Sequence, residues 1–217
     1  MERQEKAAQP RPPRLGQALE AADLAALAAL DPEEPARGLR LAGAGAGLDL
    51  WNRELAGCLL EGARLAGAQL GRWSLTDTVL RRCDLSGAQL TGAQLVRVRL
   101  EGCRMEGVQL GEAFLLDTLL EDCRLEGAQL SRGQFKRVTF ARCSLAGAAL
   151  QQLRHTGWRL EDCDLRRAEL FGTPLGGLDL TTDRLEGLVV NLRDLAGARV
   201  TVPQAAGLAK LLGLVVE

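Results

Sequence analysis

Five thiols recur at intervals of twenty residues, and they are the side chains best suited to metal or redox chemistry: Cys83, Cys103, Cys123, Cys143 and Cys163. A metal site needs ligands that converge on one point, and a catalytic thiol needs a neighbouring base. The single histidine, His155, falls in a different phase of the spacing. We therefore interpret the five cysteines as a structural core column of free thiols that act as small buried hydrophobes. A metal or redox ladder is the alternative.

Other catalytic arrangements are missing from the sequence. The chain has no tyrosine, no phosphate-binding loop and no spaced set of metal ligands. His155 has no nucleophile or orienting acid in phase with it, so we predict a hydrogen-bonded structural histidine. The basic residues form no stripe, and no aromatic residues interleave with them. We predict a non-enzymatic protein with no cofactor, no metal and no direct nucleic-acid binding.

The elements that position these residues follow a period of five. A large apolar residue stands at every fifth position and only His155 interrupts the series, which runs Leu80, Leu85, Leu90, Leu95, Leu100, Met105, Leu110, Leu115, Leu120, Leu125, Leu130, Phe135, Phe140, Leu145, Leu150, Leu160, Leu165 and Leu170. A helix repeats every 3.6 residues and a strand every two, so a period of five indicates a chain that turns a corner once per repeat. Four repeats make the twenty-residue interval of the cysteines. Residues twenty apart should then stack at the strand spacing of about 4.8 Å.

The repeats resemble the pentapeptide-repeat family, whose unit reads approximately A-(D/N)-L-x-x. The resemblance extends from about Leu48 to Val200, and examples are Ala63-Arg64-Leu65-Ala66-Gly67, Ala88-Gln89-Leu90-Thr91-Gly92, Cys123-Arg124-Leu125-Glu126-Gly127 and Ala128-Gln129-Leu130. It implies an all-β fold, a right-handed quadrilateral parallel β-helix. The central Leu or Phe and the small residue two before it should face inward. A glycine two after the centre suits a corner with unusual backbone angles.

The regions outside the repeats suggest a tail and two capping helices. We expect residues 1–14 to be disordered, and residues 15–47 to form a helix over Leu15–Leu30 and a linker. This helix either caps the first coil of the β-helix at 48–200 or is loosely attached. Trp73 in a small inward position predicts an irregular early coil, and the segment 151–158 predicts a bend or bulge. After Leu185 the pattern loosens, which predicts an incomplete last coil.

Residues 201–217 predict a C-terminal capping helix. Thr201 and Gln204 have the spacing of a capping box, and Gly213 suits the C-terminal stop. The apolar face that includes Leu208 and Leu212 covers the last coil in one interpretation and forms a dimer contact in the other.

The overall composition favours a soluble cytoplasmic protein. No apolar run approaches the roughly 20 residues that span a bilayer, and the first residues carry acids without the apolar segment of a signal peptide. We therefore expect no membrane association. The sequence does not name a protein partner.

Two surfaces are candidates for binding. The first is an apolar cluster at mid-rod, which we predict to be a partner or dimer contact: Phe114, Leu116, Leu119 and Val96, with Val79 less closely joined. The second is an acidic stripe: Glu61, Glu101, Glu121, Asp122, Glu161 and Asp162.

The acidic stripe bears on the quinolone-resistance relatives of this family, which resemble a DNA duplex and bind DNA gyrase. Residues 48–200 contain twenty acidic and twenty basic residues, so the rod has no net charge. Charges also alternate up one column, in Asp77, Arg97, Asp117 and Arg137. Such ladders cancel at a distance and imitate a polyanion poorly. We therefore expect a protein-interaction scaffold, with a gyrase-binding DNA mimic as the alternative.

Overall fold

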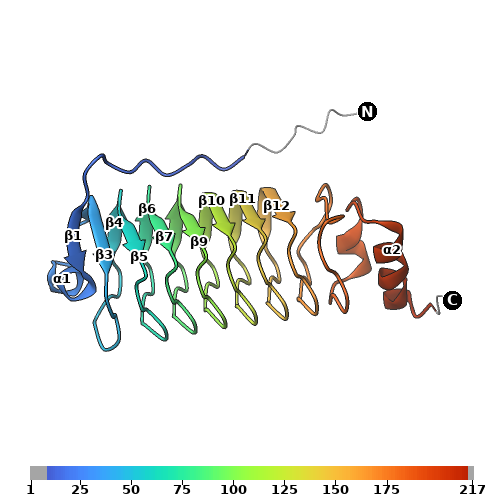
Figure 1. Cartoon of the computed structure of the whole chain (residues 1–217). Helices are drawn as coiled ribbons and strands as arrows, with labels where there is room; N and C mark the ends of the chain where they lie inside the picture. Colours follow the sequence, from blue (N-terminus) through green and yellow to red (C-terminus); the bar gives the residue numbers. More distant parts are fainter. Residues whose placement is uncertain (1–8, 215–217) are drawn as a thin grey trace.

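The computed structural model describes residues 9–214, which form an elongated parallel β-solenoid (Figure 1). Every strand pair is parallel. The elements in chain order are β1 (Glu20–Asp23), α1 (Leu24–Ala29), β2 (Ala36–Arg37), β3 (Leu39–Ala42), β4 (Glu54–Ala56), β5 (Leu59–Glu61), β6 (Ser74–Thr76), β7 (Val79–Arg81), β8 (Gln94–Val96), β9 (Arg99–Glu101), β10 (Phe114–Glu121), β11 (Gln134–Ala141), β12 (Arg154–Glu161), η1 (Leu192–Leu195), α2 (Val202–Ala209) and η2 (Lys210–Leu212).

The register confirms that residues twenty apart are stacked neighbours. Face 1 contains β4, β6, β8 and the first halves of β10, β11 and β12, and face 2 contains β5, β7, β9 and the second halves. Face 3 is a ladder of single bridges that includes Arg64 to Asp84, and face 4 is a similar ladder that includes Gln69 to Gln89. The coil is therefore four-sided, and faces 1 and 2 carry the extended strands.

The core fills the interior of the coil. The central residues of the repeats and the small residues two before them are buried in one continuous cluster. A residual cavity of about 10 Å³ lies among the leucines of residues 75–110. At the corners, Gly67 and Gly87 have φ values of 65° and 63°, as a glycine corner requires. The expected inward columns and glycine corners are thus confirmed.

The N-terminal region differs from the prediction of a helix over residues 15–30. Residues 20–23 form β1, which pairs with β3 on face 2, and the helix α1 covers only Leu24–Ala29. The solenoid therefore begins at Glu20, well before residue 48. Local Ala and Leu content predicted a helix, but pairing with β3 satisfies the backbone of residues 20–23 instead.

The extended segment before β1 also differs from the expected disorder. Residues 9–14 lie alongside the rod (Figure 1), and the backbone amides of Arg11 and Arg14 donate hydrogen bonds to Asp117 and Asp77. The prediction for residues 1–8 falls outside the described residues.

The bend or bulge predicted for residues 151–158 was wrong. β12 continues through this segment in unbroken register with β11, from Arg154 opposite Gln134 to Glu161 opposite Ala141. The large side chains are accommodated by an aromatic cluster, in which the ring of Trp158 lies 5.9 Å from Phe135 and 6.3 Å from Phe140 in edge-on geometry. The ring of Trp158 packs edge-on against Phe135 and Phe140 inside the coil, so the backbone of β12 keeps its register.

The early coil at Trp73 and the last coil had both been expected to be irregular, and the structure tests both expectations. Trp73 is fully buried, and its indole N–H donates to the Leu50 carbonyl at 2.5 Å, without a break in the pairing of β6 with β4. The expected irregular early coil was therefore wrong. The last coil is incomplete, as predicted, because η1 stands where a strand would continue.

Candidate interaction surface

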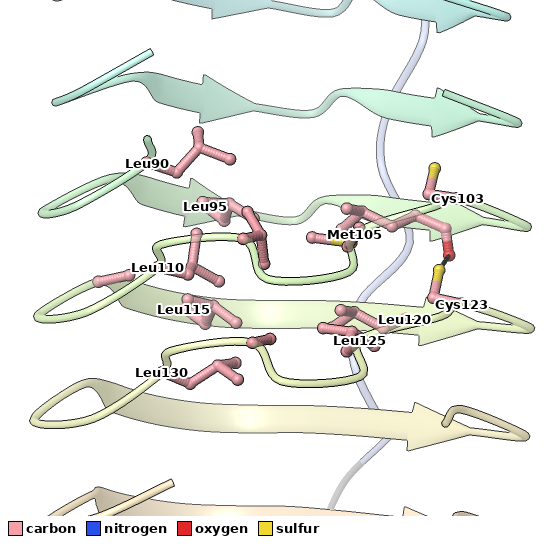
Figure 2. Close-up of a cluster of buried hydrophobic side chains, with 14 of the residues drawn as sticks. Leu90, Leu95, Cys103, Met105, Leu110, Leu115, Leu120, Cys123, Leu125 and Leu130 are labelled. Atoms are coloured by element: carbon pink, nitrogen blue, oxygen red, sulfur yellow. Dashed lines mark hydrogen bonds between the residues drawn. The ribbon is translucent and has the colours of Figure 1, made fainter. Parts of the chain in front are cut away.

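The thiol column is part of the core and offers no reactive site. The five cysteines are free and at most 2% exposed, and Figure 2 shows Cys103 and Cys123 one above the other beside the leucine columns. Each thiol donates to two carbonyls, as Cys123 does to Leu100 at 3.5 Å and Glu121 at 3.3 Å. The neighbouring Cys103 thiol and burial both raise the pKa of Cys83 well above its ordinary value. A buried thiol of this kind is a poor nucleophile at neutral pH.

His155 is held by a carbonyl rather than by a catalytic partner. Its Nε2 lies 2.5 Å from the Pro174 carbonyl oxygen, and its ring lies edge-on to Trp158 at 5.3 Å. An open hollow of about 880 Å³ lies beside it, between β12 and residues 172–176. Pro174 stands one coil above Arg154, whose amide donates to the Gly133 carbonyl of the coil below. Proline has no amide hydrogen, so the corresponding hydrogen bond cannot form at Pro174. The hollow is therefore a place where the face 1 ladder stops.

The predicted apolar cluster is brought together by the register. Leu116 pairs with Val96 one coil below, and Phe114 lies two residues away on the same face. Leu119 lies around the corner on face 2, where it pairs with Arg99 and Thr139. These four apolar side chains are half-buried, and Val79 is buried.

A charged neighbour borders this cluster. The Lys136 ammonium lies 5.7 Å from the centre of the Phe114 ring, within the range of a cation–π contact. The cluster therefore presents a mixed surface, in which an apolar strip on face 1 is flanked by a cation.

The acidic stripe is neutralised along the rod. Glu61 contacts Arg40, Arg81 and Arg82; Glu101 contacts Arg81 and Arg99; Glu121 contacts Arg99 and Arg142; Asp122 contacts Arg142; and Glu161 lies 4.0 Å from Arg159. Asp162 forms no ion pair with the described residues, and its backbone amide donates to Thr182 Oγ1 at 3.1 Å. The arginine contacts hold the pKa of Glu121 below its ordinary value, so the carboxylate is charged but paired.

The alternating column at the corner between faces 1 and 2 forms bidentate pairs. Arg97 donates two hydrogen bonds of 2.6 Å to Asp77, and Arg137 donates two of 2.6 and 2.7 Å to Asp117. These guanidinium contacts hold the pKa of both carboxyls below the usual range. The geometry agrees with the ladder expected from the sequence, and each carboxylate also accepts an amide from residues 9–14.

The central repeats match a known protein family. The family described as pentapeptide repeat region matches residues 73–150. Residues 73–150 are a pentapeptide repeat region. The structure extends the same register beyond that match on both sides, from β1 to the bridge between Asp179 and Arg199. No curated protein sequence matches the chain.

Solved structures similar to this chain include HetL, a pentapeptide repeat protein involved in heterocyst differentiation regulation from the cyanobacterium Nostoc sp. strain PCC 7120. It is 23% identical, covers 76% of this chain and 82% of its own, and has a TM-score of 0.46. Full-length QnrB1, a plasmid-mediated fluoroquinolone resistance protein, is 15% identical, covers 91% and 98%, and has a TM-score of 0.41. Rfr23 from the cyanobacterium Cyanothece 51142 is 18% identical, covers 66% and 91%, and has a TM-score of 0.40.

The described part of the solenoid contains neither a cluster of metal-ligating side chains nor a membrane-spanning helix. Among residues 9–214, no group of three or more His, Cys, Asp or Glu side chains could hold a metal ion. Within the same range, no helix is both long and apolar enough to cross a bilayer.

The C-terminal helix leaves apolar side chains on the surface. Leu208 is half-buried against the core, while the side chain of Leu212 lies outside what the structure describes. Val202 is 84% exposed and Leu214 is 55% exposed.

Sequence reasoning missed two features of the surface. The exposed large apolar residues lie toward the ends of the rod, in contrast to the half-buried mid-rod cluster: Leu15, Leu30, Trp51, Phe171, Leu192, Val202, Leu211 and Leu214. The second feature is the docked segment 9–14. The sequence signal for this segment is the pair of prolines three residues apart, Pro10 and Pro13.

Proposed function

We propose that this protein is a non-enzymatic scaffold that presents the flat faces of a pentapeptide-repeat solenoid to another protein. The main support for this proposal is the apolar strip that Phe114, Leu116 and Val96 form on a continuous parallel sheet. The core is filled, so the outer walls are the surface available for recognition. A half-buried apolar strip beside charged residues is the composition of a protein contact. The alternative occupant of the strip is a second copy of this chain.

We also propose that the protein works in the cytoplasm. The free, buried thiols support a reducing compartment, because six cysteines in an oxidising one would favour disulfides.

The double substitution Phe114→Ser and Leu116→Ser tests the scaffold proposal. We expect it to weaken self-association in sedimentation velocity, or capture of the partner, while circular dichroism shows an intact rod. Phe171→Ser is the matched control, because it removes an exposed phenylalanine outside the apolar strip, toward the C-terminal end of the rod. Unchanged sedimentation and capture in the double variant would remove the proposal.

The DNA-mimic alternative has less support from the charges. The carboxylates of the stripe contact arginines in adjacent coils, so their negative field is cancelled close to the surface. A gyrase supercoiling assay with purified protein separates the two functions. Inhibition of supercoiling, or protection of gyrase from a quinolone, would favour DNA mimicry over the scaffold.

A further inference from the structure

Residues 9–14, called the arm below, run lengthwise along the corner between faces 1 and 2. The arm leaves β1 and extends back over the rod toward its C-terminal end (Figure 1). The amide of Arg14 donates to Asp77 Oδ1 at 3.1 Å, and the amide of Arg11 donates to Asp117 Oδ1 at 3.2 Å. The carbonyl oxygen of Arg14 would lie 3.9 Å from a Cβ atom added to Gly57, so the arm passes close to the backbone there.

The distance between the two donors along a polyproline II helix nearly equals the distance between the two acceptors along the solenoid. Asp77 and Asp117 are two coils apart, or about 9.6 Å at the usual strand spacing. Arg11 and Arg14 are three residues apart, and polyproline II rises about 3.1 Å per residue, which gives about 9.3 Å. One turn of such a helix therefore spans two coils. The alternation of Asp and Arg up the column places a carboxylate at every second coil, where each turn needs an acceptor.

The burial of the arm follows the same period of three. Pro10 and Pro13 are half-buried, whereas Arg11, Pro12 and Arg14 are exposed. A polyproline II helix has three residues per turn, so Pro10 and Pro13 lie on one side, which faces the rod. The ring of proline restricts φ before docking, so ordering this segment costs little conformational entropy.

The corner that receives the arm is rigid and bounded. Arg97 and Arg137 fix the two carboxylates by bidentate contacts, and Asp117 is 3% exposed. The next positions of the column in either direction are Gly57 and Gly157, which have no side chain to accept an amide. The column therefore offers two acceptors for two successive turns.

We propose that this corner is a binding site for a polyproline II segment of a protein partner, and that the arm occupies it as a competing ligand of the same chain. The motif that it fits is Pro-x-x-Pro-x, with a free backbone amide on the residue after each proline. Basic residues are favoured at those positions, because Arg11 and Arg14 stand beside two carboxylates. The inference deepens the proposed scaffold function and rests on it for its biological meaning.

Substitution of arginine by proline in the arm tests the two amide hydrogen bonds. Arg11→Pro with Arg14→Pro removes both N–H donors and preserves the polyproline II backbone. Arg11→Ala with Arg14→Ala is the matched control, since it removes the charges but keeps the donors. A fluorophore attached through Gln9→Cys reports docking, because the six native cysteines are buried. Its steady-state anisotropy should fall in the proline variant, whose arm moves freely, and stay closer to the wild-type value in the alanine variant. Equal anisotropy in the two variants would overturn the proposal.

Competition with a peptide tests the site itself. The probe is a fluorescein-labelled peptide of residues 9–15, Gln-Pro-Arg-Pro-Pro-Arg-Leu, followed by anisotropy. We expect it to bind the full-length proline variant at least tenfold more tightly than the wild-type chain, whose own arm competes. A peptide in which both arginines are replaced by proline should lose this binding. Failure of the first peptide to bind, or equal binding of both peptides, would overturn the proposal.

The roles of the Asp77 and Asp117 carboxylates are tested in the full-length chain that carries Arg11→Pro and Arg14→Pro. Asp77→Gly with Asp117→Gly should abolish peptide binding, and glycine is tolerated because Gly57 and Gly157 already occupy this column with φ values of 64° and 69°. Retained binding would overturn the proposal. The Phe114→Ser and Leu116→Ser variant is measured separately, so the corner and the flat-face strip can fail independently.

Discussion

The two ends of the solenoid are closed by helices of similar length but very different packing. At the N-terminal end, Leu24 and Leu27 of α1 are fully buried, and the Arg53 guanidinium donates to the carbonyls of Ala28 and Leu30 at 3.1 and 2.7 Å. At the C-terminal end, α2 has no fully buried residue. Its strongest tie is the side chain of Gln204, which donates to the Leu180 and Asp183 carbonyls at 2.7 Å each.

The space beneath the two helices differs accordingly. A groove of about 360 Å³ lies between α2 and the last coils, beside Leu185 and Leu188. A repeat protein must cover the apolar end of its core. The covering helix can be held there by buried side chains or by hydrogen bonds. Here the N-terminal end relies on packing, and the C-terminal end relies on capping hydrogen bonds. We therefore expect the C-terminal end to open first.

Removal of a buried leucine at each end should give the largest contrast. Leu27→Ala leaves a cavity under α1 and should lower the free energy of unfolding by about 3 to 4 kcal/mol. Leu208→Ala, at a half-buried position of α2, should lower it by about 1 kcal/mol. Urea unfolding followed by circular dichroism measures both. Equal losses would show that the two ends are packed alike.

The buried carboxyl under the C-terminal end should make stability depend on pH. Asp183 is 5% exposed; its Oδ1 accepts the Cys163 amide at 2.7 Å, and its Oδ2 has no partner among the described residues. Burial, together with the charges of Asp162, Asp179 and Glu161, raises its pKa from 3.8 to about 6. The folded carboxyl therefore holds its proton more tightly than the unfolded one.

The sign of this effect is fixed by the raised pKa. The contribution of the protonated group is full below about pH 3.8 and is lost as the pH rises through about 6. Asp183→Asn should therefore match the wild type near pH 4 and exceed its free energy of unfolding at pH 8 by about 2 kcal/mol. Urea unfolding at both pH values is the measurement. A difference that does not grow with pH would contradict the assigned environment.

The capping box of α2 should give a small effect, comparable with that of Leu208→Ala. Thr201 Oγ1 accepts the Gln204 amide at 3.3 Å, and Gln204 Oε1 accepts the Thr201 amide at 2.7 Å. Thr201→Ala should cost about 1 kcal/mol, whereas Thr201→Ser keeps the oxygen and should cost less. Hydrogen exchange of residues 202–213 reports the loss locally. An unchanged rate in the alanine variant would mean that the Gln204 contacts to the last coil hold α2 without its cap.

Much of the middle of the rod was predictable, because its pattern is repeated. The period of five located the buried leucines, and the interval of twenty located the thiol column and the pairing of Leu116 with Val96. The ends were less predictable because they break the repeat. The capping box at Thr201 and the stop at Gly213, with φ of 74°, were visible locally, whereas the strand at Glu20–Asp23 depends on a partner nineteen residues away.

The sequence alone determined which residues face inward and which stack, since a strict period leaves a four-sided coil few other registers. Only the tertiary structure decided the conformation and position of the segments that lack this period. Residues 9–14 and 20–23 lie outside the repeat, and their positions follow from contacts with distant coils, with Asp77 and Asp117 for the arm and with β3 for the strand. The same dependence set the aromatic core at Trp158, where neighbouring rings made room that local spacing did not reveal. Local pattern fixes a repeat, but long-range contacts fix everything that caps or covers it.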